Sequence, residues 1–270
     1  MAGSVLRVKK VRIDAVLAEQ GLFPSRSAAA GAVRAGEVRV GADGPVALRP
    51  SQLVEPSATL VVDSGPRFVS RGGTKLENAL NALGIEVDGR DCLDVGASTG
   101  GFTDCLLQRG ATRVAAVDVA YGQLDLRLRE DPRVTVVERL NARALTPADL
   151  PFAVELASVD VSFISLTKIL PAVADCLAPS GELLAMVKPQ FELGRERVGR
   201  GVVRDAADRR EAIVKVARAA QALELTVRGF ASSGLPGPKG NRETFVWCGG
   251  PGPEVEDLEA AVAAVVAEDE

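Results

Sequence analysis

The last two-thirds of the chain alternates short apolar strands with helical segments, and this pattern restricts the fold more than any other feature. We predict strands at residues 92–95, 113–119, 134–138, 158–162, 182–187, 225–230 and 243–248, and helices at 101–108, 166–177 and 207–223. Such alternation forms a parallel sheet with helices on both faces. The last two strands are joined by a Gly- and Pro-rich loop without a crossover helix, so that pair should be antiparallel. The predicted fold is α/β: a doubly wound, mostly parallel seven-stranded sheet with one antiparallel strand.

Composition excludes several kinds of active site. The 270 residues are 47% hydrophobic, which is enough for one or two domains with a sizeable core, and none is histidine. Without histidine there is no Ser-His-Asp or Cys-His nucleophile and no metal site built on imidazole, so a general base must be Lys, Asp, Glu, Cys or Tyr. The four cysteines form no CxxC pair, and we interpret them as core residues in a reducing compartment. We expect no metal site.

The sequence has no feature of export or of a membrane span. The basic residues near the N-terminus are not followed by the apolar stretch of a signal peptide, and no run approaches the ~20 apolar residues that a bilayer requires. We therefore expect a soluble cytoplasmic protein that does not act on membranes.

Charge is distributed unevenly along the chain. Residues 1–73 hold 10 basic and 6 acidic residues, whereas residues 251–270 hold 7 acidic residues and no basic one. A basic module on a near-neutral body is typical of proteins that bind a polyanion, but on charge alone an ordinary solvated surface explains the pattern equally well. Within the basic part we predict helices at 11–19 and 26–34, the second capped by Ser25 and ended by Gly36, and strands at 37–40 and 60–62.

The strongest local signal is the glycine-rich segment 94–103, DVGASTGGFT, between the first predicted strand of the sheet and the helix after it. Gly96, Gly100 and Gly101 let the chain turn and let a ligand approach the amides at the start of the helix. Dinucleotide, phosphate and S-adenosylmethionine sites all use such a turn. Its GxxxGG spacing, however, is not the GxGxxG of nicotinamide enzymes.

Two carboxylates accompany this turn. Asp118 ends the second strand, where it can accept hydrogen bonds from both hydroxyls of a ribose; the alternative is a helix-capping carboxylate. Asp94 ends the first strand and can either order the glycine loop or bind the amino group of a methionine moiety.

Four further ionisable residues stand at the ends of predicted elements: Lys75, Asp160, Lys188 and Glu243. In the predicted sheet at least Asp160 and Lys188 emerge at the same carboxyl edge as the glycine turn. A lone lysine is most simply a solvated surface charge. The four residues together favour a catalytic set.

The order Lys, Asp, Lys, Glu resembles that of the FtsJ-like ribose 2′-O-methyltransferases, and the glycine turn within this sheet resembles the class I S-adenosylmethionine-dependent methyltransferases. The motifs SRGGTKL, DVGASTGGFTD, DVSFIS, VKPQFE and LPGPKGN occur in the order typical of the TlyA/hemolysin A family, and the likeness covers about residues 12–248. It implies S-adenosylmethionine as cofactor and methyl transfer to a cytidine ribose in 16S rRNA, 23S rRNA or both.

The resemblance also implies roles for single residues. Asn141 matches the position that contacts adenine, and Asp160 borders both cofactor and substrate. The implied cofactor-binding residues are Asp94, Gly96, Ser98, Thr99, Gly100, Gly101, Asp118, Asn141 and Asp160, and the implied catalytic residues are Lys75, Asp160, Lys188 and Glu243.

The segment that begins RIDAVLAEQGLFPSRSAAAG resembles the ribosomal S-four-type RNA-binding module. The signature residues are Arg12, Asp14, Ser25, Arg26, Gly36, Val38 and Val40. The resemblance implies rRNA as partner and nominates Arg12, Arg26, Arg34 and Arg39 as phosphate contacts, with Arg71 as a further RNA-binding residue. Guanidinium groups suit this role because they bind phosphate bidentately.

A ribose hydroxyl is a poor nucleophile until its proton is removed or its lone pair is aimed at the methyl group, in line with the sulfur. We expect Lys188 to touch that hydroxyl, Asp160 to anchor Lys188, and Glu243 to steer Lys75 or the ribose. Burial and Lys75 favour a neutral Lys188 amine, whereas the two carboxylates favour its ammonium form. Whether Lys188 removes the proton or only orients the oxygen therefore stays open.

We expect four parts of the chain: an RNA-binding domain at 1–63, a linker at 64–70, a methyltransferase domain at 71–250 and an acidic segment at 251–270. The segment 194–204, with its arginines and glycines, is either an RNA clamp that orders on binding or a plain surface loop. Two other functions stay open: a non-catalytic RNA-binding assembly factor that keeps the fold, and a membrane-lytic protein, for which no spanning or large basic amphipathic helix is seen in the sequence.

Overall fold

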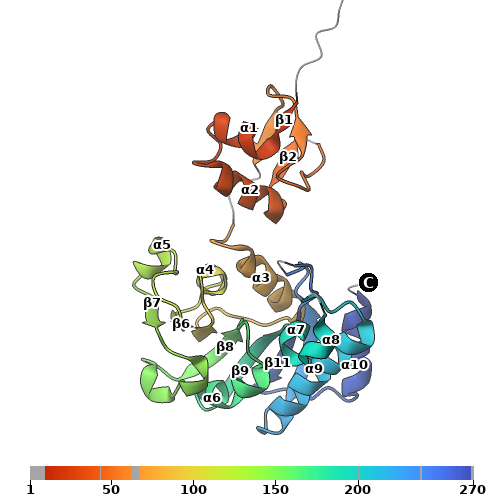
Figure 1. The fold of residues 1–270 in the computed structure, drawn as a ribbon. Helices are drawn as coiled ribbons and strands as arrows, with labels where there is room; N and C mark the ends of the chain where they lie inside the picture. The colour runs from red at the N-terminus through yellow and green to blue at the C-terminus, as the bar shows by residue number, and fades with distance from the viewer. Residues whose placement is uncertain (1–9, 43, 63–66, 200, 238, 269–270) are drawn as a thin grey trace, which may run out of the picture. The chain divides into compact units, whose positions relative to one another are not determined.

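The computed structural model describes residues 10–42, 44–62, 67–199, 201–237 and 239–268 of the chain (Figure 1). The chain divides into two compact units, with the boundary between Arg67 and Phe68. Each unit has a hydrophobic core of its own.

The first unit is a small α+β module. Its elements are β1 (Val11–Arg12), α1 (Ile13–Glu19), α2 (Arg26–Ala35), β2 (Val38–Val40), β3 (Leu53–Val54) and β4 (Leu60–Val62). β1 pairs with β3 and β2 with β4, both antiparallel. Ser25 caps α2 by accepting a hydrogen bond from the amide of Ala28, and Gly36 ends it with a φ of 78°, a left-handed conformation that glycine adopts readily. The predicted second helix and the strands after it are thus confirmed. Residue 63 of the predicted domain and residues 64–66 of the predicted linker lie outside the described residues.

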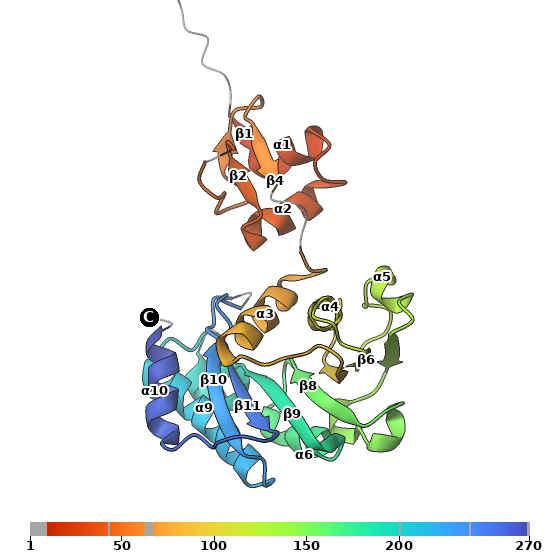
Figure 2. The ribbon, with the colours of Figure 1, turned by 180° about the vertical axis from the view of Figure 1, so that it is seen from behind.

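The second unit is built around one seven-stranded sheet. The strands are β5 (Asp91–Val95), β6 (Arg113–Asp118), β7 (Val134–Glu138), β8 (Val154–Val159), β9 (Leu177–Val187), β10 (Val227–Ser232) and β11 (Thr244–Gly249). Their order is β10-β11-β9-β8-β5-β6-β7, and β10, β11, β9 and β8 lie side by side in Figure 2. β11 is antiparallel to both of its neighbours, while the pairs from β9 to β7 are parallel. The predicted fold class, with one antiparallel strand, is confirmed.

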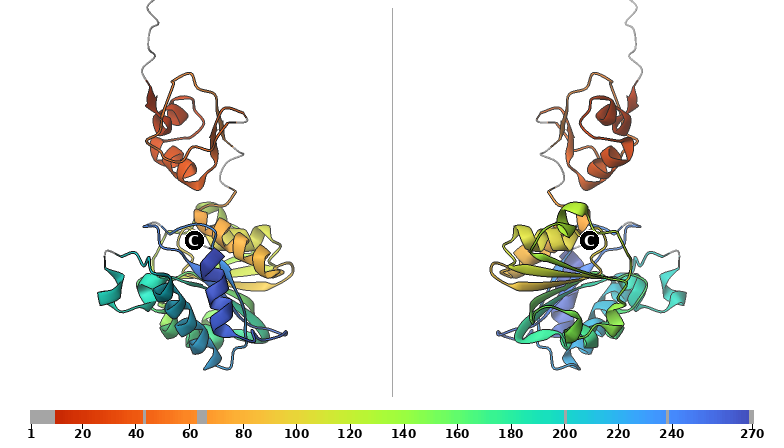
Figure 3. Two further views of the ribbon diagram at one scale, coloured as in Figure 1. Left: turned by 90° about the vertical axis from the view of Figure 1, so that its right-hand side faces the viewer. Right: turned by 90° about the vertical axis from the view of Figure 1, so that its left-hand side faces the viewer.

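Helices cover both faces of this sheet, as Figure 3 shows. α3 (Arg71–Leu83) and α4 (Gly101–Gln108) cover one face, and α6 (Leu170–Ala174), α9 (Ala206–Gln221) and α10 (Leu258–Glu268) cover the other. Residues of β9 alternate between the two cores: Leu184 and Met186 pack under α3 and α4, whereas Leu183, Ala185 and Val187 face α9. Burial on both faces explains why the central strands are continuous apolar runs.

The structure corrects several predicted boundaries. The strand predicted at 158–162 is β8, which ends at Val159, so Asp160 begins a loop. The helix predicted at 166–177 is a 3₁₀ turn, η3 (Leu166–Lys168), followed by the short α6, and β9 already begins at Leu177. Pro171 near the start of α6 contributes no backbone N–H, which favours a new helix start over one continuous helix.

Among the described helices longer than four residues, two were not predicted. α3 covers one face of the sheet, and its first turn lines the cavity described below. α10 occupies the acidic C-terminal segment. α10 buries Val262, Val265 and Val266 against α9 and β10, so the acidic residues there accompany a packed helix.

Candidate active site

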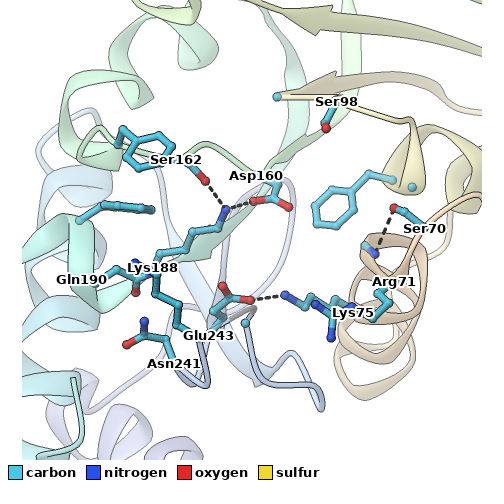
Figure 4. Close-up of a pocket in the computed structure, with 18 of the residues that line it drawn as sticks. Ser70, Arg71, Lys75, Ser98, Asp160, Ser162, Lys188, Gln190, Asn241 and Glu243 are labelled. Carbon is cyan, nitrogen blue, oxygen red and sulfur yellow. Dashed lines mark hydrogen bonds and ion pairs between the residues drawn. The ribbon is translucent and has the colours of Figure 1, made fainter. Parts of the chain in front are cut away.

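A partly enclosed cavity lies at the carboxyl ends of the parallel strands, where the crevice of an open α/β sheet is expected (Figure 4). It has a volume of about 530 Å³. Its walls come from the start of α3, the glycine turn after β5, the loop after β8, the segment after β9 and the loop before β11. Four of its lining residues are the ionisable set singled out in the sequence: Lys75, Asp160, Lys188 and Glu243.

One ion pair in the cavity joins Lys188, directly after β9, to Asp160, directly after β8. Lys188 Nζ also donates a hydrogen bond to Ser162 Oγ at 2.9 Å. The contact with Asp160 is an ion pair, and the hydrogen bond to Ser162 uses one of the three N–H donors of the ammonium. Both side chains retain partial access to solvent from the cavity. The structure thus contains the expected contact in which Asp160 anchors Lys188.

A second ion pair joins Lys75 of α3 to Glu243, the residue before β11. It is much more deeply buried: Lys75 is 6% and Glu243 2% exposed. Two opposite charges at this depth are tolerable only because each neutralises the other. The structure therefore brings all four predicted catalytic residues to one cavity, as two ion pairs from four separate segments.

The glycine turn forms another wall of the cavity. Gly96 and Gly100 have φ values of 86° and 97°, a region that side-chain-bearing residues rarely adopt. A Cβ on Gly96 would lie 2.3 Å from the backbone oxygen of Asp160, and one on Gly101 would lie 2.2 Å from Ser70 Oγ. Ser98 and Thr99 also line the cavity. Glycine is thus required both for the turn and for the close approach of neighbouring segments.

Asp94 lies beneath this turn and is fully buried. Its Oδ2 accepts hydrogen bonds from the amide and the hydroxyl of Thr103, at 2.9 and 2.7 Å, so the carboxylate fixes the start of α4. Its Oδ1 has no partner among the described residues. Burial raises the pKa of Asp94 to about 7; the Thr103 hydroxyl opposes this, and the charge of Asp160 adds to it.

Four predicted cofactor residues do not line the large cavity: Asp94 and Gly100, described above, and Asp118 and Asn141. Asp118 accepts hydrogen bonds from the amides of Ser98 and Ala120, both at 2.7 Å, and borders a much smaller recess next to the glycine turn. Asn141 caps the 3₁₀ turn η1 (Ala142–Ala144) by accepting a hydrogen bond from the Arg143 amide at 3.0 Å. The amides of Ser98 and Ala120 lie in a turn and a bend and do not begin a helix, so these bonds are not the helix cap that was the alternative for Asp118. Contacts to ribose and adenine remain predictions.

The predicted RNA-binding arginines fall in two places. Arg71 begins α3 and lines the cavity. In the first unit, Arg12 donates through Nε and Nη2 to the buried carboxylate of Asp14, and Arg26 donates to the same carboxylate at 3.3 Å. Arg12 lowers the pKa of Asp14, through its hydrogen bond more than its charge. Arg34 is exposed in the last turn of α2, and Arg39 is partly exposed in β2.

Several cavity residues were not singled out by the sequence interpretation. Ser162 and Phe163 follow Asp160, Gln190 and Phe191 follow Lys188, and Asn241 precedes Glu243. The first four stand inside the DVSFIS and VKPQFE motifs, so the signal was adjacency to a predicted catalytic residue. The rings of Phe163 and Phe191 contact each other, with centroids 5.2 Å apart.

Asn241 links two loops at the rim. Its side chain accepts from the Val203 amide and donates to the Gly201 carbonyl, both at 2.8 Å. Upstream, Arg197 of α8 (Arg195–Val198) forms ion pairs with Asp208 and Glu211 at the start of α9. The described part of segment 194–204 is therefore tied down on both sides, and Val198 and Gly201 line the cavity.

The described residues contain no group of three or more Cys, Asp or Glu side chains suited to holding a metal ion. In the same residues, no helix has both the length and the apolar character to cross a bilayer.

Comparison with known proteins agrees with this architecture. The profile of the FtsJ-like methyltransferase family matches residues 68–250, and that of the S4 domain matches residues 11–60. The chain is 49% identical over 242 residues to the 16S/23S rRNA (cytidine-2′-O)-methyltransferase TlyA of Mycobacterium tuberculosis, covering 88% of this chain and 90% of that protein.

Two further likenesses extend over almost the whole chain. The putative rRNA methyltransferase YqxC of Bacillus subtilis is 42% identical over 254 residues, which cover 93% of this chain and 90% of YqxC. The solved structure of a putative hemolysin from Streptococcus thermophilus has a TM-score of 0.74 at 39% identity, covering 97% of this chain and 96% of that one.

Proposed function

The chain belongs to the FtsJ-like methyltransferase family, and on this premise we propose that it transfers a methyl group from S-adenosylmethionine to the ribose 2′-hydroxyl of a cytidine in 16S or 23S rRNA. The relative that is 49% identical over 88% of the chain carries this activity in its name. The observation that carries the proposal is the convergence of Lys75, Asp160, Lys188 and Glu243 on one cavity at the carboxyl edge of the sheet.

The cavity suits this cofactor. When bound, S-adenosylmethionine supplies a methyl group on a positively charged sulfonium, next to a methionine amino group. The turn at Gly96, Gly100 and Gly101 gives close backbone approach at the start of α4, where amides point into the crevice. The carboxylate of Asp160 supplies negative charge for a cationic ligand, and the unpartnered Oδ1 of Asp94 offers a hydrogen-bonding oxygen beneath the turn. We assign cofactor binding to this wall, with Ser98, Thr99, Asp118 and Asn141 completing it.

Lys188 is the residue that we place against the 2′-hydroxyl. The ion pair with Asp160 and the hydrogen bond to Ser162 hold Nζ in place, so a remaining N–H of the ammonium is fixed in direction rather than free to rotate. This orients one lone pair of the hydroxyl oxygen toward the methyl group, an arrangement that accelerates transfer by alignment. As the O–C bond forms and the S–C bond breaks, the hydroxyl proton leaves to Lys188 if its amine is neutral, or to water if it is charged.

The buried pair of Lys75 and Glu243 sets the opposite wall. Because the pair is nearly neutral and inaccessible, its role in the proposed reaction is to hold a fixed dipole beside the ribose rather than to exchange protons with solvent. Arg71, from the same helix as Lys75, is the cavity residue best suited to a phosphate of the bound RNA.

The first unit supplies RNA affinity in this proposal. Its S4 match and the exposed arginines of α2 support binding to folded RNA through phosphates. The solved relative is titled a putative hemolysin, yet the membrane-lytic alternative gains no support from the described helices.

The test is methylation of 30S and 50S subunits with labelled S-adenosylmethionine, followed by nuclease digestion and mass spectrometry of the nucleosides. We expect 2′-O-methylcytidine, and we expect Lys188→Ala to lower kcat by at least ~100-fold while the Kd for S-adenosylmethionine stays within about threefold. A methylated base in place of a methylated ribose would refute the catalytic assignment. Subunit binding without methylation of either would favour the assembly-factor alternative.

A further inference from the structure

A further link joins the two segments that carry Asp160 and Lys188, and neither residue takes part in it. Its centre is Glu192, the last residue of α7 (Pro189–Glu192), which is 5% exposed. Glu192 Oε1 accepts a hydrogen bond from the Leu166 amide at 2.7 Å, and Oε2 accepts one from Ser165 Oγ at 2.5 Å. Both carboxylate oxygens are thus committed to the segment that follows Asp160.

Glu192 is itself held from the other side. Lys215 of α9 donates a hydrogen bond from Nζ to the Glu192 backbone oxygen at 2.5 Å, and lies 3.7 Å from Oε2. The end of α7 is therefore fixed to a long helix of the scaffold. Through Glu192 the loop after β8 is fixed to the same scaffold.

The loop that Glu192 holds has an unfavourable backbone. Phe163, between Asp160 and Ser165, has a φ of 65°, which a bulky side chain rarely adopts. Its side chain is 91% exposed, so burial does not compensate for this conformation. Strained residues persist only when the structure around them determines their geometry, and they gather at functional sites. The hydrogen bonds that Ser165 and Leu166 donate to Glu192 fix the loop two and three residues after Phe163.

We propose that Glu192 is a positioning residue for methyl transfer. It fixes the loop 160–166 against α7, so that Asp160 and Ser162 hold the Lys188 ammonium at one distance and direction from the ribose. The inference rests on the proposed function, because it assigns the purpose of this link to the proposed reaction. Glu192 does not line the cavity and touches neither substrate nor cofactor, so its effect passes through Lys188.

The same sheet contains a second buried carboxylate, Glu182, which is not bonded to the loop after β8. Glu182 is 4% exposed, lies in the middle of β9, and accepts hydrogen bonds from Arg90 at 2.5 Å and Arg228 at 2.7 Å. Its burial resembles that of Glu192 and both of its oxygens also accept hydrogen bonds, although from two guanidinium groups, and it does not contact the carboxyl edge where Lys188 stands. Substitution of Glu182 therefore measures what loss of a buried, doubly bonded carboxylate does to the fold alone.

The experiment compares Glu192→Ala and Glu192→Gln with Glu182→Ala and Glu182→Gln in the full chain. For each protein kcat on ribosomal subunits, the Kd for S-adenosylmethionine, the Tm, and deuterium uptake of the peptide covering residues 160–168 are measured. We expect kcat to fall ~100-fold for Glu192→Ala and roughly tenfold for Glu192→Gln, whose carboxamide keeps one acceptor, with the Kd unchanged within about threefold. Deuterium uptake of the loop should rise in the same order. The Glu182 variants should keep kcat within about twofold even where the Tm falls.

Two results would overturn the proposal: unchanged kcat in Glu192→Ala, or a loss of kcat that follows the Tm equally in both series. Failure of the proposed function is separate, since it shows as a wild-type protein that makes no 2′-O-methylcytidine. Deuterium uptake decides in that case, because it needs no substrate: raised uptake in Glu192→Ala supports the link between loop and helix, and unchanged uptake refutes it.

Discussion

At the scale of single residues, the pair of Lys75 and Glu243 separates a structural role from a catalytic one. Neutralising one partner, as in Lys75→Met or Glu243→Gln, leaves the other charge buried without compensation and should lower the free energy of unfolding by about 3–5 kcal/mol. The double variant removes both charges and should recover most of that loss. Methyl transfer should be lost in all three proteins, since the proposed reaction uses the charged pair at the cavity wall.

Urea unfolding followed by Trp247, the single tryptophan, together with kcat on ribosomal subunits, measures both quantities. A double variant that regains activity along with stability would show that the pair only holds the fold.

Asp94 gives a pH dependence whose sign follows from its raised pKa. An unfolded aspartate loses its proton near pH 4, whereas folded Asp94 retains it up to about pH 7. Between these values the folded state binds more protons, so this group lowers the free energy of unfolding by up to ~1.4 kcal/mol for each unit of rising pH. Above pH 7 its contribution is constant. Asp94→Asn should remove the slope.

The measurement is the difference in free energy of unfolding between Asp94→Asn and wild type at pH 5, 6, 7 and 8, without cofactor. The free energy of unfolding of Asp94→Asn should rise relative to that of wild type from pH 5 to pH 7, and the difference should then stay constant. A difference that is the same at every pH would contradict burial as the cause.

At the scale of elements, the glycine turn can be tested against a glycine of similar conformation elsewhere. Gly96 and Gly84 both have positive φ, 86° and 65°, so alanine at either position costs about 1–2 kcal/mol in backbone conformation. A Cβ on Gly84, at the end of α3, would meet nothing within 4 Å, whereas one on Gly96 would meet the backbone oxygen of Asp160 at 2.3 Å. Only the second substitution must displace a catalytic segment.

We therefore expect Gly84→Ala to lose at most ~2 kcal/mol of stability with kcat unchanged, and Gly96→Ala to lose kcat at least ~100-fold in addition. Calorimetric titration of S-adenosylmethionine and initial rates on ribosomal subunits distinguish them. Equal behaviour of the two variants would mean that the turn is needed for its conformation alone.

The elements also show what sequence reasoning could reach. β7 (Val134–Glu138) and α4 (Gly101–Gln108) were predicted with their observed bounds, because a run of β-branched residues and a helix behind a glycine turn have local signals. β8 (Val154–Val159) was displaced, because Val159 and Val161 have similar apolarity and only tertiary pairing with β5 decides where the strand stops.

The four residues of the candidate site could be predicted from the sequence, but not which of them form ion pairs with each other. Lys75 and Glu243 are 168 residues apart, and nothing local in the sequence states that they form one ion pair. Asn141 and Asp118 show the opposite limit: their positions after strands suggested ligand contacts, while in the structure both accept hydrogen bonds from nearby backbone amides. Backbone capping and ligand binding use the same oxygens, so spacing alone does not distinguish them.

At the scale of the whole molecule, the proposal assigns RNA affinity to one unit and chemistry to the other. The total charge is −4, so binding to a polyanion depends on where the basic residues lie rather than on the sum. The exposed Arg26 and Arg34 stand at opposite ends of α2. Arg12, by contrast, is engaged through two nitrogens by Asp14, which leaves it fewer donors for phosphate.

We expect Arg26→Gln and Arg34→Gln, each in the full chain, to raise the KM for ribosomal subunits while kcat and the Kd for S-adenosylmethionine stay unchanged. Each lost phosphate contact should also reduce the slope of log affinity against log salt concentration by about one. Arg133→Gln is the matched control, because Arg133 is an exposed arginine paired with Asp131 just before β7, at the edge of the sheet opposite the cavity. Equal KM values for all three variants would mean that loss of charge anywhere weakens binding, and that the first unit has no specific role in RNA recognition.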